Sequence, residues 1–297
     1  MQFGISIPNN QGVESARTLA DLAAEAEAEG YGSVWVSEHL FHASYVDKRL
    51  GNRPYHEALT VLTACAMRTE RALLGTSVLV LPWHHPARLA KTLATIDDLS
   101  AGRVVLGIGV ATTEDEFQAL GVPFRQRGRI ANEMLDAMKT LWRDEYPEHH
   151  GRYHDFQGLR FSPKPVQKPG IPIWVGGNSD AAIERIVRHG DGWHPLRQSP
   201  EEVAQKRALI LQRARAAGRS DLETVPIAVR LAVAFKHHAW DRPVEQRRAA
   251  LGSAAEMRAL VDAYAAAGVT HVIVDSGSGN PAEIRAVHRR FIDEVAR

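Results

Sequence analysis

The stretch Gly32-Ser33-Val34-Trp35-Val36-Ser37-Glu38-His39-Leu40 decides the fold, because a short apolar strand runs directly into a carboxylate and an imidazole. In a parallel barrel, side chains that follow the C-terminal end of a strand lie at the mouth where catalysis takes place. Glu38 and His39 at such a place can transfer a proton, or can form a hydrogen-bonded pair with a purely structural role. The rest of the chain must show whether a barrel, a cofactor site and a cavity surround them.

Strand and helix patterns alternate on both sides of this stretch. Residues 3–7 form an apolar strand, 15–29 an amphipathic helix that Gly30 ends, and 33–36 the next strand. Further strands are expected at 73–81, 103–110, 173–177, 190–195, 227–235 and 271–275, with helices at 55–68, 86–99, 124–143, 180–189, 200–217, 254–267 and 281–296. Eight strand–helix units predict the α/β class and a (β/α)8 TIM barrel, in one domain over residues 1–297.

Two segments interrupt this alternation. Residues 41–54 lack a clear pattern and are long for a connection inside a compact domain, which is typical of functional loops. Residues 145–170 are rich in Pro, Gly, His and aromatic residues, and are expected to form an insertion that contains a hairpin. Both segments are candidate lids over the barrel mouth.

Composition excludes several classes of partner. The formal net charge of +1 over 297 residues gives no electrostatic case for nucleic acid or an anionic membrane. No apolar run approaches the roughly 18 residues of a membrane span, and the N-terminus enters strand pattern without a signal-like leader. The single cysteine, Cys65, is expected to be a buried, inert thiol. A cytoplasmic enzyme that acts on a small-molecule substrate is the expectation.

The strongest candidate for anion binding is Gly176-Gly177-Asn178-Ser179, which joins a strand to a helix. Glycines let the backbone approach a ligand closely, and N–H groups at a helix N-terminus favour a phosphate. A tight turn with a capped helix explains the same residues. Gly107-Ile108-Gly109 is weaker, because it lacks the full dinucleotide fingerprint. The 14 histidines show no metal-ligand spacing, so no metal is expected.

Several segments together resemble the luciferase-like monooxygenase superfamily, and in particular its branch of deazaflavin (coenzyme F420)-dependent oxidoreductases. They occur in family order and become sparse after about Pro200. The matching segments are residues 35–40, 93–103, 107–110, 116–117, 121–128, 161–169, 173–178 and 190–193.

The resemblance implies a bacterial-luciferase-like barrel, commonly a homodimer, which binds F420 or, alternatively, FMN at its mouth. It implies His39 as the catalytic histidine with Glu38 beside it, and a bulge with a non-prolyl cis peptide under the ring. The residues expected to bind the cofactor are Thr76, Ser77, Val78, Gly109, Gly176, Gly177, Asn178 and Ser179. One departure concerns Ala111-Thr112, where Gly-Trp would be expected in the closest relatives.

Three functions remain open at this point. The first is an F420-dependent oxidoreductase that transfers a hydride to or from a small organic substrate, with His39 and Glu38 managing the proton. The second is an FMN-dependent monooxygenase that uses reduced flavin and oxygen. The third is a flavin- or deazaflavin-binding protein without turnover, and an unrelated phosphate-substrate isomerase is a further alternative on the same barrel.

Overall fold

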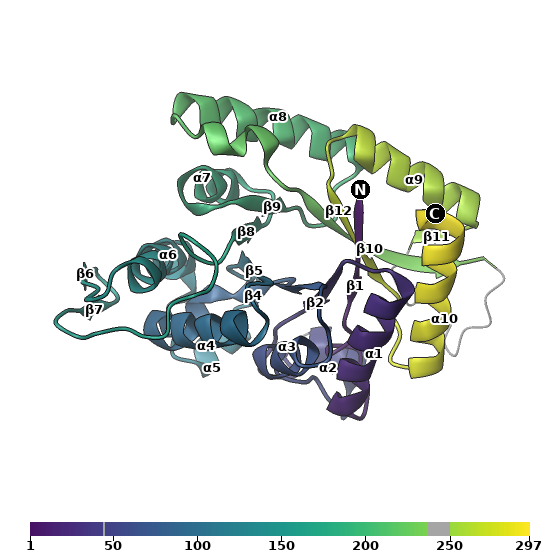
Figure 1. Cartoon of the computed structure of the whole chain (residues 1–297), viewed down its shortest axis with the longest axis horizontal. Helices are drawn as coiled ribbons and strands as arrows, with labels where there is room; N and C mark the ends of the chain where they lie inside the picture. The colour runs from purple at the N-terminus through teal and green to yellow at the C-terminus, as the bar shows by residue number, and fades with distance from the viewer. Residues whose placement is uncertain (44, 237–249) are drawn as a thin grey trace.

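Eight parallel strands follow one another around a barrel in the order in which they occur in the chain (Figure 1). The computed structural model describes residues 1–43, 45–236 and 250–297. Starting from β1, the order around the barrel is β1-β2-β3-β5-β8-β9-β10-β12, and β12 pairs with β1. A parallel bridge between Trp193 and Ile227 connects β9 to the segment that leads into β10. The expected (β/α)8 barrel is therefore confirmed.

Helices surround the barrel, as Figure 1 shows, and the bounds of the elements in the described residues are as follows. The strands are β1 Gln2–Ser6, β2 Ser33–Val36, β3 Leu73–Thr76, β4 Leu79–Val80, β5 Val104–Gly109, β6 His149–His150, β7 Asp155–Phe156, β8 Ile173–Gly176, β9 Gly192–His194, β10 Ala228–Phe235, β11 Ala250–Gly252 and β12 His271–Asp275. The α-helices are α1 Ala16–Glu29, α2 Tyr45–Leu50, α3 Ala58–Ala66, α4 Pro86–Leu99, α5 Asp115–Ala119, α6 Arg127–Arg143, α7 Asp180–His189, α8 Pro200–Ala216, α9 Ala254–Ala266 and α10 Pro281–Phe291. Short 3-10 helices are η1 Leu81–Trp83, η2 Phe124–Gln126 and η3 Ser220–Thr224, and a π-helical turn, η5 Ile292–Ala296, ends the chain.

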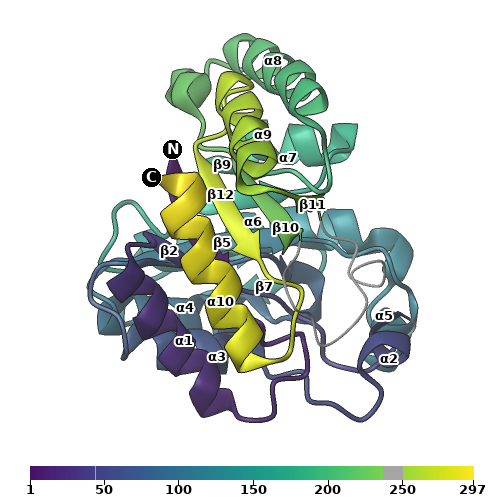
Figure 2. The same ribbon diagram turned by 90° about the vertical axis from the view of Figure 1, so that its right-hand side faces the viewer.

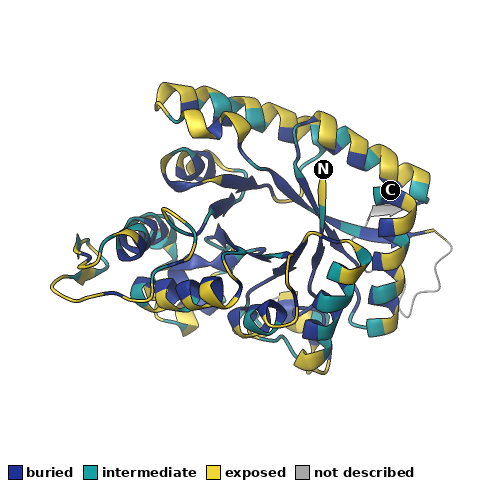
Figure 3. Cartoon of the chain, in the orientation of Figure 1, coloured by how far each residue is buried: buried dark blue, intermediate teal, exposed yellow. Residues whose placement is uncertain are grey.

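The strands of the barrel are mostly buried, whereas the hairpin strands β6 and β7 are not, and the outer faces of the helices are exposed (Figure 3). Every residue of β2 and β5 is buried, which explains their nearly continuous apolar sequences. Helix α1 buries one apolar face and ends at Gly30, whose φ of 106° favours glycine. Amphipathic helices cover the outer face of the sheet, and side chains inside the barrel cover its inner face. Burial of both faces is what the alternating pattern predicts.

Tryptophan side chains pack inside the barrel toward the N-terminal ends of the strands. The rings of Trp35 and Trp174 lie 5.3 Å apart, and Trp174 also contacts His271, the first residue of β12, at 4.9 Å. Gly75 makes room for this layer, because a Cβ atom there would lie 2.0 Å from the Trp35 ring. The barrel is thus a packed core below its mouth, so a ligand can enter only from the C-terminal ends of the strands.

The third strand is broken by a bulge, as the resemblance implied. Gly75 of β3 pairs with Val105, whereas Leu79 of β4 pairs with Ile108, so the third strand uses one residue more than its partner. The peptide bond between Ser77 and Val78 within this bulge is cis. The sequence pattern of 73–81 predicted one continuous strand, and that expectation is wrong at these residues.

The two irregular segments differ in how well they were predicted. The insertion contains the expected hairpin, an antiparallel pair formed by β6 and β7. The 41–54 loop, expected to be irregular, contains the helix α2. Figure 2 shows α2 and α5 at the end of the barrel opposite the two chain termini, which is the end that holds the strand C-termini. Strand β11, which pairs in parallel with the end of β10, was not predicted either.

The described residues contain neither a membrane-spanning helix nor a cluster of metal ligands. Among residues 1–43, 45–236 and 250–297, no helix has the length and apolarity needed to cross a membrane. In the same residues, no group of three or more His, Cys, Asp or Glu side chains is arranged to hold a metal ion. Cys65 is buried in α3, as expected, and burial raises the pKa of its thiol to about 12.

Candidate active site

His39 lies at the barrel mouth directly after β2, and its partner is Glu116 of α5. The imidazole Nδ1 is 2.5 Å from Glu116 Oε2, and the backbone N–H of Leu40 donates to Glu116 Oε1 at 2.9 Å. The exposed fraction of the Glu116 side chain is 1%, against 15% for His39. An ionised carboxylate only accepts hydrogen bonds, so Nδ1 carries a proton and Nε2 is the nitrogen that can exchange one.

The exchangeable nitrogen of His39 meets Tyr45, the first residue of α2. The phenol oxygen is 2.6 Å from His39 Nε2. Tyr45 is 52% exposed, so a hydrogen-bonded chain runs from the buried Glu116 carboxylate through His39 to a phenol that contacts solvent. Such a chain can hold a proton at the site and pass it to water.

The Glu38 carboxylate binds other partners than the His39 ring, so the two side chains do not form the hydrogen-bonded pair that their adjacency suggested, and a role of Glu38 in proton transfer stays a prediction. Its carboxylate accepts from the backbone N–H of Val80 at 2.7 Å and contacts His84 Nε2 at 2.8 Å. Burial lowers the pKa of His84, but the hydrogen bond and the negative charge of Glu38 outweigh it and leave that pKa raised. Successive side chains of an extended segment point to opposite sides, which explains why Glu38 and His39 have different partners.

A second polar network crosses the mouth beside the bulge. Arg230 of β10 donates to Asp275 of β12 at 2.8 Å and to Ser37 Oγ at 2.8 Å. Burial would raise the pKa of Asp275, but the Arg230 cation and the Gly277 N–H hold it lowered. Sequence reasoning found neither residue, although Asp275 ends an apolar strand just as Glu38 follows one.

The bulge residues are held by their neighbours from β5, β9 and β10. Thr76 Oγ1 donates to the carbonyl of Gly107 at 2.7 Å, and Ser77 Oγ is 2.8 Å from His194 Nε2. His194 Nδ1 contacts the carbonyl of Ala228, so Nδ1 carries the proton and Nε2 accepts from Ser77. Burial lowers the pKa of His194 to about 4, so the ring is neutral near pH 7.

Gly109 and Gly176 make room for Val78 rather than offering their backbone freely. A Cβ atom on Gly109 would lie 2.7 Å from Val78 Cγ2, and one on Gly176 would lie 3.2 Å from Val78 Cγ1. Val78 itself is only partly buried, so it presents a surface at the mouth. These two glycines therefore seat the bulge, on which the resemblance places the cofactor ring.

In the predicted anion site, some hydrogen-bonding groups already have partners within the protein and others do not. The N–H of Gly177 donates to the His194 carbonyl, and the Asn178 side chain binds the backbone of Leu196. Ser179 caps α7 by accepting from Ala182 N at 3.2 Å. The backbone N–H groups of Asn178 and Ser179 have no partner within the described residues. They offer an anion two donors at the start of a ten-residue helix.

Some of the buried polar atoms that have no partner in the part of the chain that the structure describes belong to residues near His39. They are the Tyr55 hydroxyl and Trp83 Nε1, and a further such atom, Arg49 Nε, belongs to the same helix as Tyr45. The Tyr55 and Trp83 rings lie 5.7 and 5.9 Å from the His39 ring. Buried polar groups in native proteins are normally hydrogen-bonded, so this set fits a site that a polar ligand completes. The residues present are thus compatible with a flavin-type cofactor and its substrate.

Glu116 and Tyr45, the two partners of His39, were not assigned from the sequence either. Glu116 lies in the matching segment 116–117 but received no role, and Tyr45 lies in the 41–54 loop, which has no clear pattern. An acidic residue in a short helix after the strand at 103–110 was the available signal, because that position also lies at the barrel mouth. Nothing local connected it to His39, which is 77 residues away.

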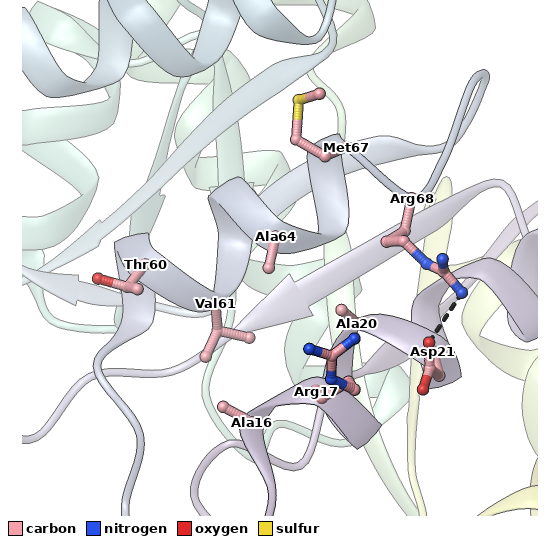
Figure 4. A pocket seen from close by; sticks show the side chains of 9 residues that line it. All are labelled: Ala16, Arg17, Ala20, Asp21, Thr60, Val61, Ala64, Met67 and Arg68. Atoms are coloured by element: carbon pink, nitrogen blue, oxygen red, sulfur yellow. Dashed lines mark hydrogen bonds and ion pairs between the residues drawn. The ribbon is translucent and has the colours of Figure 1, made fainter.

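A separate apolar groove lies between α1 and α3, away from the mouth (Figure 4). Its walls include Ala20, Val61, Ala64 and Met67, and its volume is about 380 Å³. Met67 is 64% exposed there, and an ion pair between Arg68 and Asp21 lies at its edge. None of the predicted site residues lines this groove.

Comparison with known proteins agrees with the fold. The family model for luciferase-like monooxygenase matches residues 1–242. An FMNH2-dependent dimethylsulfone monooxygenase of Pseudomonas putida is 30% identical over 263 residues, which cover 88% of this chain and 67% of the relative. An F420-dependent glucose-6-phosphate dehydrogenase of Kineococcus radiotolerans is 35% identical over 179 residues, which cover 59% of this chain and 51% of the relative.

A solved structure adds evidence for the fold alone. The monooxygenase RslO1 of Streptomyces bottropensis superposes with a TM-score of 0.82 at 24% identity, covering 100% of this chain and 99% of the other. Both of the relatives named above are oxidoreductases, one dependent on F420 and the other on FMNH2. The family model spans most of the chain, and the protein belongs to the luciferase-like monooxygenase family.

Proposed function

We propose that this protein is an F420-dependent oxidoreductase that transfers a hydride between the deazaflavin and a small organic substrate. The observation that carries the proposal is the chain Glu116–His39–Tyr45 at the barrel mouth. Within this family, the 35% identity to an F420-dependent dehydrogenase supports the choice of cofactor.

His39 manages the proton that accompanies hydride transfer. A bound deazaflavin supplies a two-electron hydride acceptor or donor. Glu116 keeps Nδ1 protonated and orients the ring, so Nε2 can take a proton from the substrate side or return one through Tyr45.

Two parts of the mouth would hold the cofactor. The bulge formed by Thr76, Ser77 and Val78 would support its ring, and the N–H groups of Asn178 and Ser179 would bind its phosphate. Gly177, with a φ of 105°, leaves space above them, because its added Cβ would meet only Ala182 at 3.5 Å. Gly109 and Gly176 would contribute indirectly by seating Val78.

An FMN-dependent monooxygenase is the second candidate. The relative that covers 88% of this chain is an FMNH2-dependent monooxygenase. The same mouth would then have to admit oxygen beside a reduced flavin, and His39 would again supply or accept a proton.

Two sets of assays test the proposal. In the first, which is anaerobic, F420 is incubated with a panel of alcohols, and reduced F420 with ketones, aldehydes and conjugated enones. In the second, FMNH2 is assayed with oxygen. Turnover with F420 supports the first candidate, turnover only with FMNH2 and oxygen supports the second, and cofactor binding without turnover across the panel indicates a binding protein.

Variants of the chain then test His39. H39A is expected to bind the cofactor as the wild type does and to lower turnover by about 10²- to 10⁴-fold, the usual contribution of a general acid or base. E116Q is expected to lower turnover less, because the amide can still contact Nδ1 but no longer accepts as a carboxylate does. His150, which is exposed on the hairpin, provides the control H150A. Unchanged turnover in H39A would refute the role of His39.

Two further expectations belong to this proposal: a homodimer and a cytoplasmic location. The exposed apolar groove between α1 and α3 supports an association, because burying Met67 against a second copy would remove apolar surface from water. Light scattering on the purified protein measures the molecular mass, and a monomer at micromolar concentration would contradict the homodimer.

A further inference from the structure

Arg49 is a cation at the barrel mouth that has no anionic partner in the described residues. It lies in α2, one helical turn after Tyr45, whose hydroxyl contacts His39. Side chains four residues apart on a helix lie on the same face, so Arg49 is on the side of α2 that faces the site. Its Nε is buried, and no ion pair or side-chain hydrogen bond of Arg49 is found in residues 1–43, 45–236 and 250–297.

Arg230, which lies near Arg49, differs from it in having hydrogen-bond partners. Arg230 has Asp275 and Ser37 as partners, and the other oxygen of Asp275 accepts from the N–H of Gly277. No hydrogen bond or ion pair joins Asp275 to Arg49 in the described residues. Burial lowers the pKa of Arg49 and the Arg230 cation adds to this, whereas Tyr55, Tyr45 and the more distant Asp275 carboxylate act against it, and a guanidinium stays charged in proteins. A partly buried charge without a partner is costly, which favours an anionic ligand.

Other donors around His39 share this need. Tyr55 has a buried hydroxyl and Trp83 a buried indole N–H, neither with a partner among the described residues. Burial raises the pKa of Tyr55, and the cations of Arg230 and, less strongly, Arg49 act against it, so both guanidinium groups lie on the side of that phenol. Guanidinium and indole groups only donate, and a phenol donates readily, so the matching ligand carries oxygen acceptors.

We propose that the substrate carries a carboxylate, and that Arg49 binds it together with Tyr55 beside His39. This deepens the proposed function and rests on it for the identity of the reaction. A bidentate contact to a guanidinium fixes both the position and the orientation of a carboxylate. Aromatic rings of Tyr45, Tyr55 and Trp83 surround His39, so an apolar body attached to the carboxylate suits the rest of the site.

Matched pairs of small ligands test the proposal without knowledge of the substrate. Acetate, hexanoate and benzoate, each beside its primary amide, are titrated into the protein by calorimetry, with and without F420. The wild type is expected to prefer at least one carboxylate over its amide by tenfold or more, because charge-assisted hydrogen bonds are stronger than neutral ones. R49M is expected to abolish this preference, and Y55F to reduce it.

Two variants serve as controls. Lys48 is the exposed neighbour of Arg49, so K48M removes the same charge without touching the site and should leave the preference intact. R49K keeps the charge but not the planar fork, and should retain a reduced preference. Circular dichroism confirms that each variant is folded, and R49K carries the test if R49M is not.

Four outcomes would overturn the proposal. They are no carboxylate preference in the wild type, an unchanged preference in R49M, an equal loss in K48M, and a loss of FMN affinity in R49M without a loss of riboflavin affinity. The last would assign Arg49 to the phosphate of the cofactor. Carboxylate binding that depends on Arg49 in a protein that binds neither F420 nor FMN would refute the proposed function while leaving the anion site standing.

Discussion

At the scale of single residues, Glu116 changes the interpretation of the site most. His39 and Glu38 are adjacent in sequence, and their adjacency suggested a pair. In the fold the imidazole contacts Glu116, whereas Glu38 contacts Val80 and His84. The proton chain therefore joins α5, the end of β2 and α2, and the roles of His39 and Glu116 in turnover stay predictions.

Ala111 gives a prediction at this scale. Its φ of 52° lies in the left-handed region, which costs an L-residue about 1–2 kcal/mol. Relatives were expected to carry glycine there, and glycine adopts this conformation without penalty. A111G should therefore raise the free energy of unfolding by about 0.5–1 kcal/mol, after allowance for the entropy of glycine in the unfolded chain.

Urea unfolding at constant m-value measures this change. The same substitution at Ala204, which is exposed inside α8, should lower stability by about 1 kcal/mol. If A111G destabilised the protein as A204G does, the strain at Ala111 would be disproved.

At the scale of elements, the end of β2 organises the mouth. Asn9 beyond β1 donates to the Ser37 carbonyl at 2.8 Å and accepts from the Ser37 N–H at 3.1 Å. On the other side, Glu38 joins β2 to β4 and η1 through Val80 and His84. The bulged third strand is thus fixed to its neighbour by a buried carboxylate.

E38Q tests this connection through its dependence on pH. The folded-state pKa of His84 is raised above its unfolded value, so the pair contributes its full stability below about pH 6.5 and loses it as the pH rises through the folded pKa. E38Q should therefore destabilise the protein by on the order of 1 kcal/mol more at pH 5.5 than at pH 8.5.

Urea unfolding of both proteins at the two pH values provides the comparison, and NMR titration should show a lower His84 pKa in E38Q. An equal destabilisation at both pH values would mean that the charge of Glu38 does not act on His84.

Periodicity sufficed to predict most elements, because burial of both sheet faces imposes apolar strands and amphipathic helices. It could not predict α2, since a six-residue helix has little intrinsic stability and depends on tertiary contacts. The break at Ser77–Val78 is also invisible locally, because its register is set against β5. His39 could be identified from the sequence because it follows the end of a predicted strand. Glu116 and Arg230 could be assigned to the site only from the folded chain.

At the scale of the whole molecule, tryptophan side chains pack the interior of the barrel, and the polar networks lie at the C-terminal ends of the strands. This arrangement favours ligand binding at that end of the barrel. Arg230 has a carboxylate partner there, whereas Arg49 has none within the described residues. The net charge of the chain, +1, does not reveal this local excess of positive charge. The organisation of residues 1–297 as one domain stays a prediction.

Titration of the purified protein with F420 and with FMN, followed by thermal unfolding, tests the central claim most directly. We expect F420 to bind and, at about 100 times its dissociation constant, to stabilise the fold by about 2.7 kcal/mol. H39A should give the same stabilisation, because His39 is assigned to turnover rather than to cofactor binding. Stabilisation by FMN alone would favour the monooxygenase, and the absence of a shift with either cofactor would contradict the account.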